Sequence, residues 1–120
     1  MNQSVIAAVD DMLFASKIRA VAEHLGVTVR FARTVPAVIE AARTERPSVV
    51  IVDLHSQRCQ PLELARELKA DVDLSSISLV GFFSHVDTAL GIAAEEAGYD
   101  RVMPRSAFSN NLAGILSSES

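Results

Sequence analysis

One cysteine is all that the 120-residue chain contains. The lone Cys59 excludes an internal disulfide framework and a CxxC pair, which is typical of a protein in a reducing compartment. No apolar run approaches the roughly 18 residues of a membrane span, and the N-terminus lacks the basic region of a signal peptide. We therefore expect a cytoplasmic protein without a membrane segment.

An excess of positive charge is also missing. The 11 basic and 15 acidic residues are scattered and give a net charge of −4, so no positive stripe is present to neutralise a nucleic-acid backbone. Glycine-rich phosphate loops and GxSxG elbows are absent as well, which leaves nucleotide-binding and hydrolase functions without support. The chain is 49% hydrophobic. That content and the length predict a single domain over residues 1–120, and the polar residues 117–120 are expected to form a frayed end. The scattered basic residues predict no direct binding of nucleic acid.

The hydrophobic pattern alternates between strands and helices. Strands are expected near residues 5–9, 27–31, 49–52, 77–83 and 102–103, and a helix follows each of them. The run 49–52 is the most hydrophobic β-branched stretch and predicts the central strand, ending at Asp53. Residues 27–31 alternate apolar with polar and indicate an edge strand.

Helix boundaries and buried stripes can be predicted in the same way. Gly26 and Gly98 end the first and fourth helices, Thr34 caps the second, and the third runs from Pro61 to Val72. The expected stripes are Phe14, Ile18, Val21 and Leu25 in the first helix, Ala89, Ala93 and Ala97 in the fourth, and Phe108, Leu112 and Ile115 in a single last helix.

Five strand-helix units with short connections predict an α/β fold with an open parallel sheet and helices on both faces. Ligands in such sheets bind beyond the carboxyl ends of the strands. Asp10 and Asp11 follow the first strand and Asp53 ends the third. Three carboxylates in one place repel each other unless a cation lies among them, which favours Mg²⁺ and phosphoryl transfer.

This pattern resembles the receiver domains of two-component response regulators over nearly the whole chain. The matching segments are Val9-Asp10-Asp11, Val50-Ile51-Val52-Asp53, Ala97-Gly98-Tyr99-Asp100 and the stretch from Arg105 to Phe108. The spacings from Asp53 to Phe83 and from Phe83 to Arg105 also agree with those of the family. The resemblance implies a flavodoxin-like, doubly wound, five-stranded parallel sheet and a signalling switch rather than an enzyme.

The resemblance also implies roles for individual residues. Asp53 would accept a phosphoryl group from a sensor histidine kinase or a phosphotransfer protein. Asp11 would bind Mg²⁺ directly and Asp10 mainly through water, while Asp53 and the backbone carbonyl of His55 would complete the protein ligands. The output would be contact with a downstream protein partner through the fourth helix, the fifth strand and the fifth helix.

Several positions depart from the family pattern. Phe83 occupies the position of a serine or threonine hydroxyl, so its ring would project over the pocket, and the neighbouring Ser84 could supply the hydroxyl only through a bulge or a one-residue shift. Arg105 replaces a lysine and keeps the charge with a different geometry. Val102 stands at the place of an aromatic switch residue.

Other interpretations remain open at this stage. Asp11 could simply cap the first helix and Asp53 could be a turn residue, although the agreement of Asp10, Asp11 and Asp53 in type and position argues against coincidence. The leading hypothesis is a phosphorylated switch. The alternatives are a phosphorylation-independent pseudo-receiver that binds a partner constitutively, and a fragment of a larger regulator.

Overall fold

The computed structural model describes residues 3–117, which form one five-stranded parallel sheet in the order β2-β1-β3-β4-β5. The strands are β1 (Ser4–Ala8), β2 (Thr28–Phe31), β3 (Val49–Asp53), β4 (Ser78–Phe83) and β5 (Arg101–Pro104). The helices are α1 (Met12–Leu25), α2 (Val35–Glu45), α3 (Pro61–Ala70), α4 (Thr88–Ala97), α5 (Arg105–Asn110) and α6 (Leu112–Leu116). The flavodoxin-like doubly wound fold is confirmed.

The strand order explains the hydrophobicity of each strand. β3 is the central strand and all five of its residues are buried, as its unbroken β-branched run predicts. β2 lies at an edge, where Thr28 and Arg30 are exposed while Val29 and Phe31 pack against the core. Both predictions from the hydrophobic pattern are confirmed.

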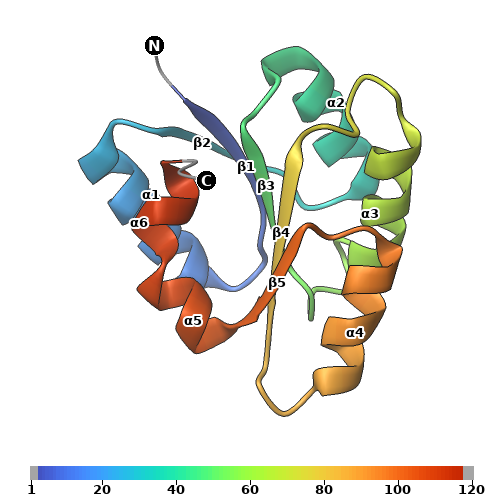
Figure 1. Ribbon diagram of the computed structural model, residues 1–120. Helices are drawn as coiled ribbons and strands as arrows, with labels where there is room; N and C mark the ends of the chain where they lie inside the picture. Colours follow the sequence, from blue (N-terminus) through green and yellow to red (C-terminus); the bar gives the residue numbers. More distant parts are fainter. Residues whose placement is uncertain (1–2, 118–120) are drawn as a thin grey trace.

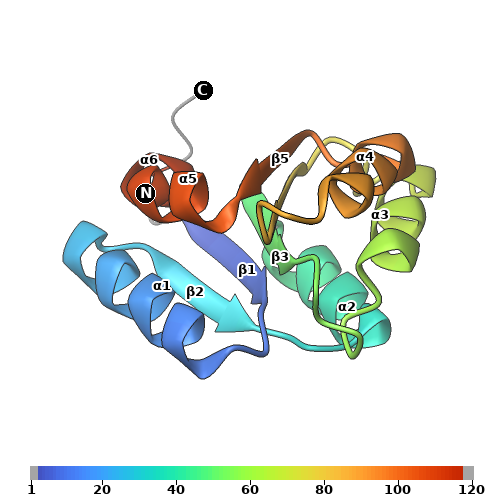
Figure 2. The same ribbon diagram turned by 90° about the horizontal axis from the view of Figure 1, so that it is seen from below.

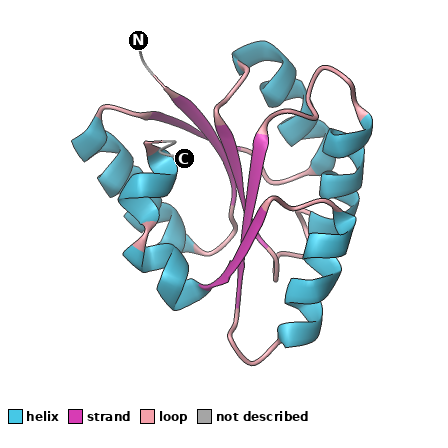
Figure 3. Cartoon of the chain, viewed as in Figure 1, coloured by secondary structure: helices cyan, strands magenta, loops and turns pink. Residues whose placement is uncertain are grey.

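Two helical layers cover the sheet, one on each face (Figures 1 and 3). α1, α5 and α6 lie on one side, and their apolar cluster includes Ile18, Phe82 and Phe108. α2, α3 and α4 lie on the other side, around a second cluster that includes Leu64 and Phe83. The strand order reverses between β1 and β3, since β2 is added on one side of β1 and β3 on the other. The loops after β1 and β3 therefore flank the switch point where ligands bind in such folds.

Three of the predicted helix boundaries agree with the structure. Gly26 adopts a left-handed conformation (φ 73°) after α1, and its N–H bonds back to the Ala22 and Glu23 carbonyls. The Thr34 hydroxyl accepts a hydrogen bond from the N–H of Ala37 at 3.2 Å and caps α2. Gly98 ends α4 at φ 123°.

Two of the predicted stripes are wrong in detail. In α1 the predicted Ile18 is buried and Phe14 and Val21 pack against the same cluster, but Leu25 is exposed, and Ala15 and Ala22 are buried in addition. In α4 the buried residues are Gly91 and Ala94 rather than the three predicted alanines, of which Ala89 is exposed. A helix made mostly of alanine and glycine carries too little contrast in hydrophobicity to mark its buried face.

Two helix ends also differ from the prediction. The single last helix is divided at Asn111, whose side-chain amide donates to the Ala107 carbonyl at 2.7 Å and interrupts the regular pattern. α3 ends at Ala70, since Asp71 adopts an extended conformation and its carboxylate accepts from the N–H of Asp73. Of the predicted frayed end, Ser117 is described as the C-cap of α6, and 118–120 lie outside the described residues.

Candidate functional site

The carboxyl ends of β1 and β3 bring three aspartates to one edge of the sheet. β1 and β3 pair in parallel with Ala8 opposite Val52, so the loop carrying Asp10 and Asp11 begins beside Asp53. Figure 2 views the molecule from this edge, where the loops after β1 and β3 lie next to each other. The predicted acidic site is therefore assembled from two neighbouring strands.

Asp53 is the most enclosed of the three. The residue is 4% exposed, and one carboxylate oxygen accepts a hydrogen bond from the His55 backbone N–H at 2.9 Å. Burial raises the pKa of the Asp53 carboxyl above its usual value, and the negative charge of Asp11 adds to this effect. The His55 N–H and the positive charge of Arg105 act against it.

The Asp11 carboxylate faces the helix that it precedes. Its Oδ1 accepts from the backbone N–H groups of Leu13 at 2.8 Å and Phe14 at 3.2 Å. Asp11 is thus the N-cap of α1, which agrees with the alternative prediction that this residue caps the first helix. The cap and the acidic site share one residue, because the loop that carries Asp11 begins beside the end of β3.

The Asp10 carboxylate is held by groups that the sequence did not identify. The Ser56 hydroxyl donates to Oδ2 at 2.6 Å, while Arg33 Nε and Arg58 Nη1 lie 3.5 Å and 3.9 Å from Oδ1. Ser56 is itself buried and accepts from the N–H of Cys59. No residue pattern marks these partners, because they come from loops after β2 and β3.

Arg105 is the first residue of α5 and lies within electrostatic reach of Asp53. Its guanidinium carbon is 5.8 Å from the centroid of the Phe14 ring, which in turn stacks on Phe82 at 4.9 Å. Its Nε is buried and has no hydrogen-bond partner among residues 3–117. A buried guanidinium nitrogen without an acceptor is rare in folded proteins and leaves this donor of Arg105 unsatisfied among the described residues.

The end of β4 continues in regular register, with Asp53 opposite Phe82 and Phe83 opposite Pro104. No extra residue is inserted before Ser84, whose backbone N–H donates to His55 Nε2 at 2.9 Å. Ser84 therefore lies beside the loop that follows Asp53. The bulge that would bring its hydroxyl to the position of the family serine or threonine is absent from β4 as described.

The Phe83 ring points away from the carboxylates. It is 9% exposed and belongs to the apolar cluster on the α2-α3-α4 face, together with Val102. Its Cζ lies 3.0 Å from the position that a Cβ on Gly91 of α4 would take. The expectation that this ring projects over the acidic pocket is wrong, because the strand directs it into the gap under α4.

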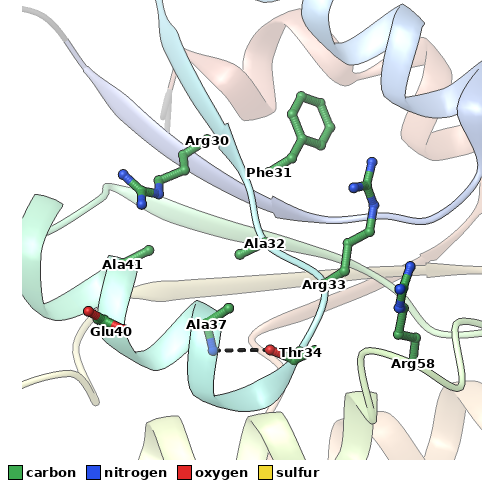
Figure 4. Close-up of a pocket in the computed structure, with 9 residues that line it drawn as sticks. All are labelled: Arg30, Phe31, Ala32, Arg33, Thr34, Ala37, Glu40, Ala41 and Arg58. Carbon is green, nitrogen blue, oxygen red and sulfur yellow. Dashed lines mark hydrogen bonds between the residues drawn. The ribbon is translucent and has the colours of Figure 1, made fainter.

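A cavity of about 390 Å³ opens beside the acidic cluster, between β2, α2 and the loop after β3 (Figure 4). Its charged lining consists of Arg30, Arg33, Arg58 and Glu40. In Figure 4, Arg33 and Arg58 lie at one end of the cavity and Arg30 at the other. Asp53 does not line it.

The carboxylate oxygens of the cluster face protein partners rather than one common point. Among residues 3–117, no three His, Cys, Asp or Glu side chains are grouped so that they could hold a metal ion. Repulsion between the three charges favours this arrangement, in which each carboxylate has its own donors. The donor chemistry, hard oxygens from carboxylates, still suits a divalent cation such as Mg²⁺.

Comparison with known proteins gives structural relatives only. No protein-family model matches the chain, and no curated protein matches it significantly. The chemotaxis response regulator CheY4 of Vibrio cholerae matches with a TM-score of 0.82 and 13% identity, over 98% of each chain. The phosphorylated cyanobacterial phytochrome response regulator RcpA matches at 0.79 and 16%, over 98% of this chain and 91% of that chain. The Mn²⁺-bound form of response regulator Rcp1 matches with a TM-score of 0.78 and 16% identity, over 96% of this chain and 92% of that chain.

These matches show that the chain has the fold of a response-regulator receiver domain. Within that fold, it carries Phe83 at the end of β4 and Arg105 at the start of α5. In the described part of the chain, no helix is both long and apolar enough to cross a membrane.

Proposed function

We propose that the protein is a receiver switch of two-component signalling that accepts a phosphoryl group on Asp53. The observation that carries this proposal is the buried Asp53 carboxylate at the end of the central strand, beside the loop that carries Asp10 and Asp11 and within the electrostatic influence of Arg105. Such an arrangement offers an oxygen nucleophile and a positive charge for the oxyanion that forms beside it.

In the proposed reaction, an Asp53 oxygen attacks the phosphorus of a phosphohistidine on a sensor kinase or phosphotransfer protein. The new O–P bond forms as the P–N bond breaks, and the imidazole leaves with the electron pair. Arg105 offsets the charge of the transferred group. The Ser84 backbone N–H donates to His55 Nε2 and joins the loop after β4 to the loop that follows Asp53.

Asp11, Asp53 and the His55 carbonyl would hold Mg²⁺ directly, and Asp10 would contact it through water. When bound, the ion would offset part of the negative charge that develops on the phosphoryl group. His55 follows Asp53 by two residues and its N–H already bonds to the Asp53 carboxylate, so the loop that would provide the carbonyl is fixed relative to Asp53.

The experiment is direct phosphorylation followed by intact mass measurement. The protein is incubated with Mg²⁺ and a small phosphodonor, beside an Asp53→Asn variant and an Asp73→Asn variant that changes an exposed aspartate away from the site. We expect a phosphoryl adduct on the wild type and on Asp73→Asn, and none on Asp53→Asn. A folded wild type without an adduct refutes the switch and leaves the constitutive binding module.

As a switch, the protein would act in the cytoplasm and signal by contact with a downstream protein rather than by turnover of a substrate. A phosphoryl group shifts a conformational equilibrium only if it interacts differently with the two states. The proposal therefore also predicts that phosphorylation changes the amide NMR spectrum beyond the Asp53 site, on the surface of α4, β5 and α5.

A further inference from the structure

Asp10 already has two cationic partners within the protein. Arg33 Nε lies 3.5 Å and Arg58 Nη1 3.9 Å from the same oxygen, Oδ1, while the other oxygen accepts the Ser56 hydroxyl at 2.6 Å. Both oxygens of this carboxylate are therefore engaged. A divalent cation approaching Asp10 meets two guanidinium groups that lie against the same oxygen.

The position of Arg33 is fixed by more than its charge. Its Nε–H also donates to the Val9 carbonyl at 3.3 Å, so the side chain reaches from the end of β2 to the end of β1. Arg33 lies between the buried Ala32 and the helix cap Thr34. Arg58 reaches the same oxygen from a different loop, after β3, and Figure 4 shows the two side chains at the same end of the cavity.

Positive groups of the protein already act on two of the three carboxylates of the acidic cluster. Three carboxylates, those of Asp10, Asp11 and Asp53, share the edge of the sheet. Arg33 and Arg58 are paired with Asp10, and the charge of Arg105 acts on Asp53. The repulsion that would otherwise favour uptake of a divalent cation is thereby reduced.

We propose that Arg33 and Arg58 are resident counter-cations of the acidic cluster and compete with Mg²⁺ for it, which keeps its affinity for the ion low. This inference deepens the proposed function by naming what regulates metal uptake at the same site. It depends on that function only for the choice of Mg²⁺, since it concerns binding and not phosphoryl transfer.

The test is titration of the full chain with Mg²⁺ by isothermal titration calorimetry at low ionic strength. The variants are Arg33→Gln, Arg58→Gln and the double variant. Arg30→Gln is the matched control, because Arg30 lines the same cavity and is also exposed but pairs with Glu45 at 2.7 Å. We expect the double variant to bind Mg²⁺ at least about tenfold more tightly than the wild type, because two charges next to Asp10 are removed. Arg30→Gln should change the affinity much less.

Two further variants separate charge from structure. Arg33→Lys keeps the charge and loses the planar Nε donor to Val9, so it should bind Mg²⁺ like the wild type. Adding Asp10→Asn to the double variant should abolish the gain, if the arginines act through Asp10. Circular dichroism establishes that each variant is folded.

The inference is overturned if the folded double variant binds Mg²⁺ no more tightly than the wild type, or if neither binds it. It is also overturned if Arg30→Gln produces the same gain, since the effect would then be one of overall charge. These outcomes are independent of the mass measurement with a phosphodonor, so failure of one proposal is distinguishable from failure of the other.

Discussion

The contact between Phe83 and Gly91 predicts that the effect of Gly91→Ala on the free energy of unfolding changes sign with the residue at position 83. A Cβ on Gly91 would lie 3.0 Å from Phe83 Cζ and 3.3 Å from both Cε atoms, and the ring is only 9% exposed. Replacing glycine with alanine inside a helix normally gains about 1 kcal/mol. Forcing a methyl group into a filled core costs about 1 to 3 kcal/mol, so Gly91→Ala should destabilise the protein by about 1 kcal/mol.

Replacing the Phe83 ring with a shorter side chain should reverse the effect of Gly91→Ala. Leucine lacks the Cε and Cζ atoms, so in a Phe83→Leu background Gly91→Ala should stabilise the protein by up to about 1 kcal/mol. The coupling between the two sites is then about 2 kcal/mol. Gly114 in α6 is the control, because nothing lies within 4 Å of its Cβ position, and Gly114→Ala should stabilise the protein in both backgrounds.

Urea unfolding of the four members of the cycle, followed by circular dichroism, measures these free energies at constant m-value. The reasoning is refuted if Gly91→Ala stabilises the Phe83 protein as much as it stabilises the Leu variant. Such a result would mean that the ring moves aside at no cost and does not fill the space beneath α4.

Three further predictions concern single residues. Burial raises the pKa of Asp53, so the native state binds its proton more tightly than the unfolded chain does, and ionisation costs stability as pH rises through the native pKa. Asp53→Asn should therefore raise the melting temperature at pH 7.5. A difference in melting temperature between variant and wild type that did not narrow toward pH 4 would contradict this. The Tyr99 hydroxyl donates to the Pro61 carbonyl at 2.8 Å, and Tyr99→Phe should cost about 1 kcal/mol in urea unfolding, whereas no loss would show that water replaces the donor. Asp11→Ala should lower the free energy of unfolding by about 1 kcal/mol through loss of the α1 cap, whereas Asp11→Ser should keep most of the capping stabilisation. Equal losses of stability in the two variants would assign the effect to the charge of Asp11.

The sheet could be predicted because its signals are local. The β-branched run before Asp53 and the alternation in residues 27–31 each depend on neighbours in sequence, and both strands appear where expected. The face of α4 could not be predicted, because what selects Gly91 for burial is the ring of Phe83 on a different element. The division of the last helix depends on how the Asn111 amide is oriented, which periodicity does not show.

The site shows the same division between local and tertiary information. Asp53 and the capping role of Asp11 follow from strand ends and helix starts. The partners of Asp10 do not, because Arg33 and Arg58 reach it from two other loops and their residue types are common on any surface. Sequence spacing thus located the carboxylates, whereas the cations that balance them required the tertiary structure.

The arrangement around β4 separates the acidic site from the surface that would report on it. Phe83 and Val102 lie in the apolar cluster under α4, so no hydroxyl on the last residue of β4 can follow a phosphoryl group on Asp53. The polar connection that does run from the loop after β3 to the loop after β4 is the hydrogen bond between the Ser84 N–H and His55 Nε2. His55 offers a direct polar route for a signal from Asp53 toward α4, because this residue contacts both the Asp53 carboxylate and the start of the loop that leads to α4.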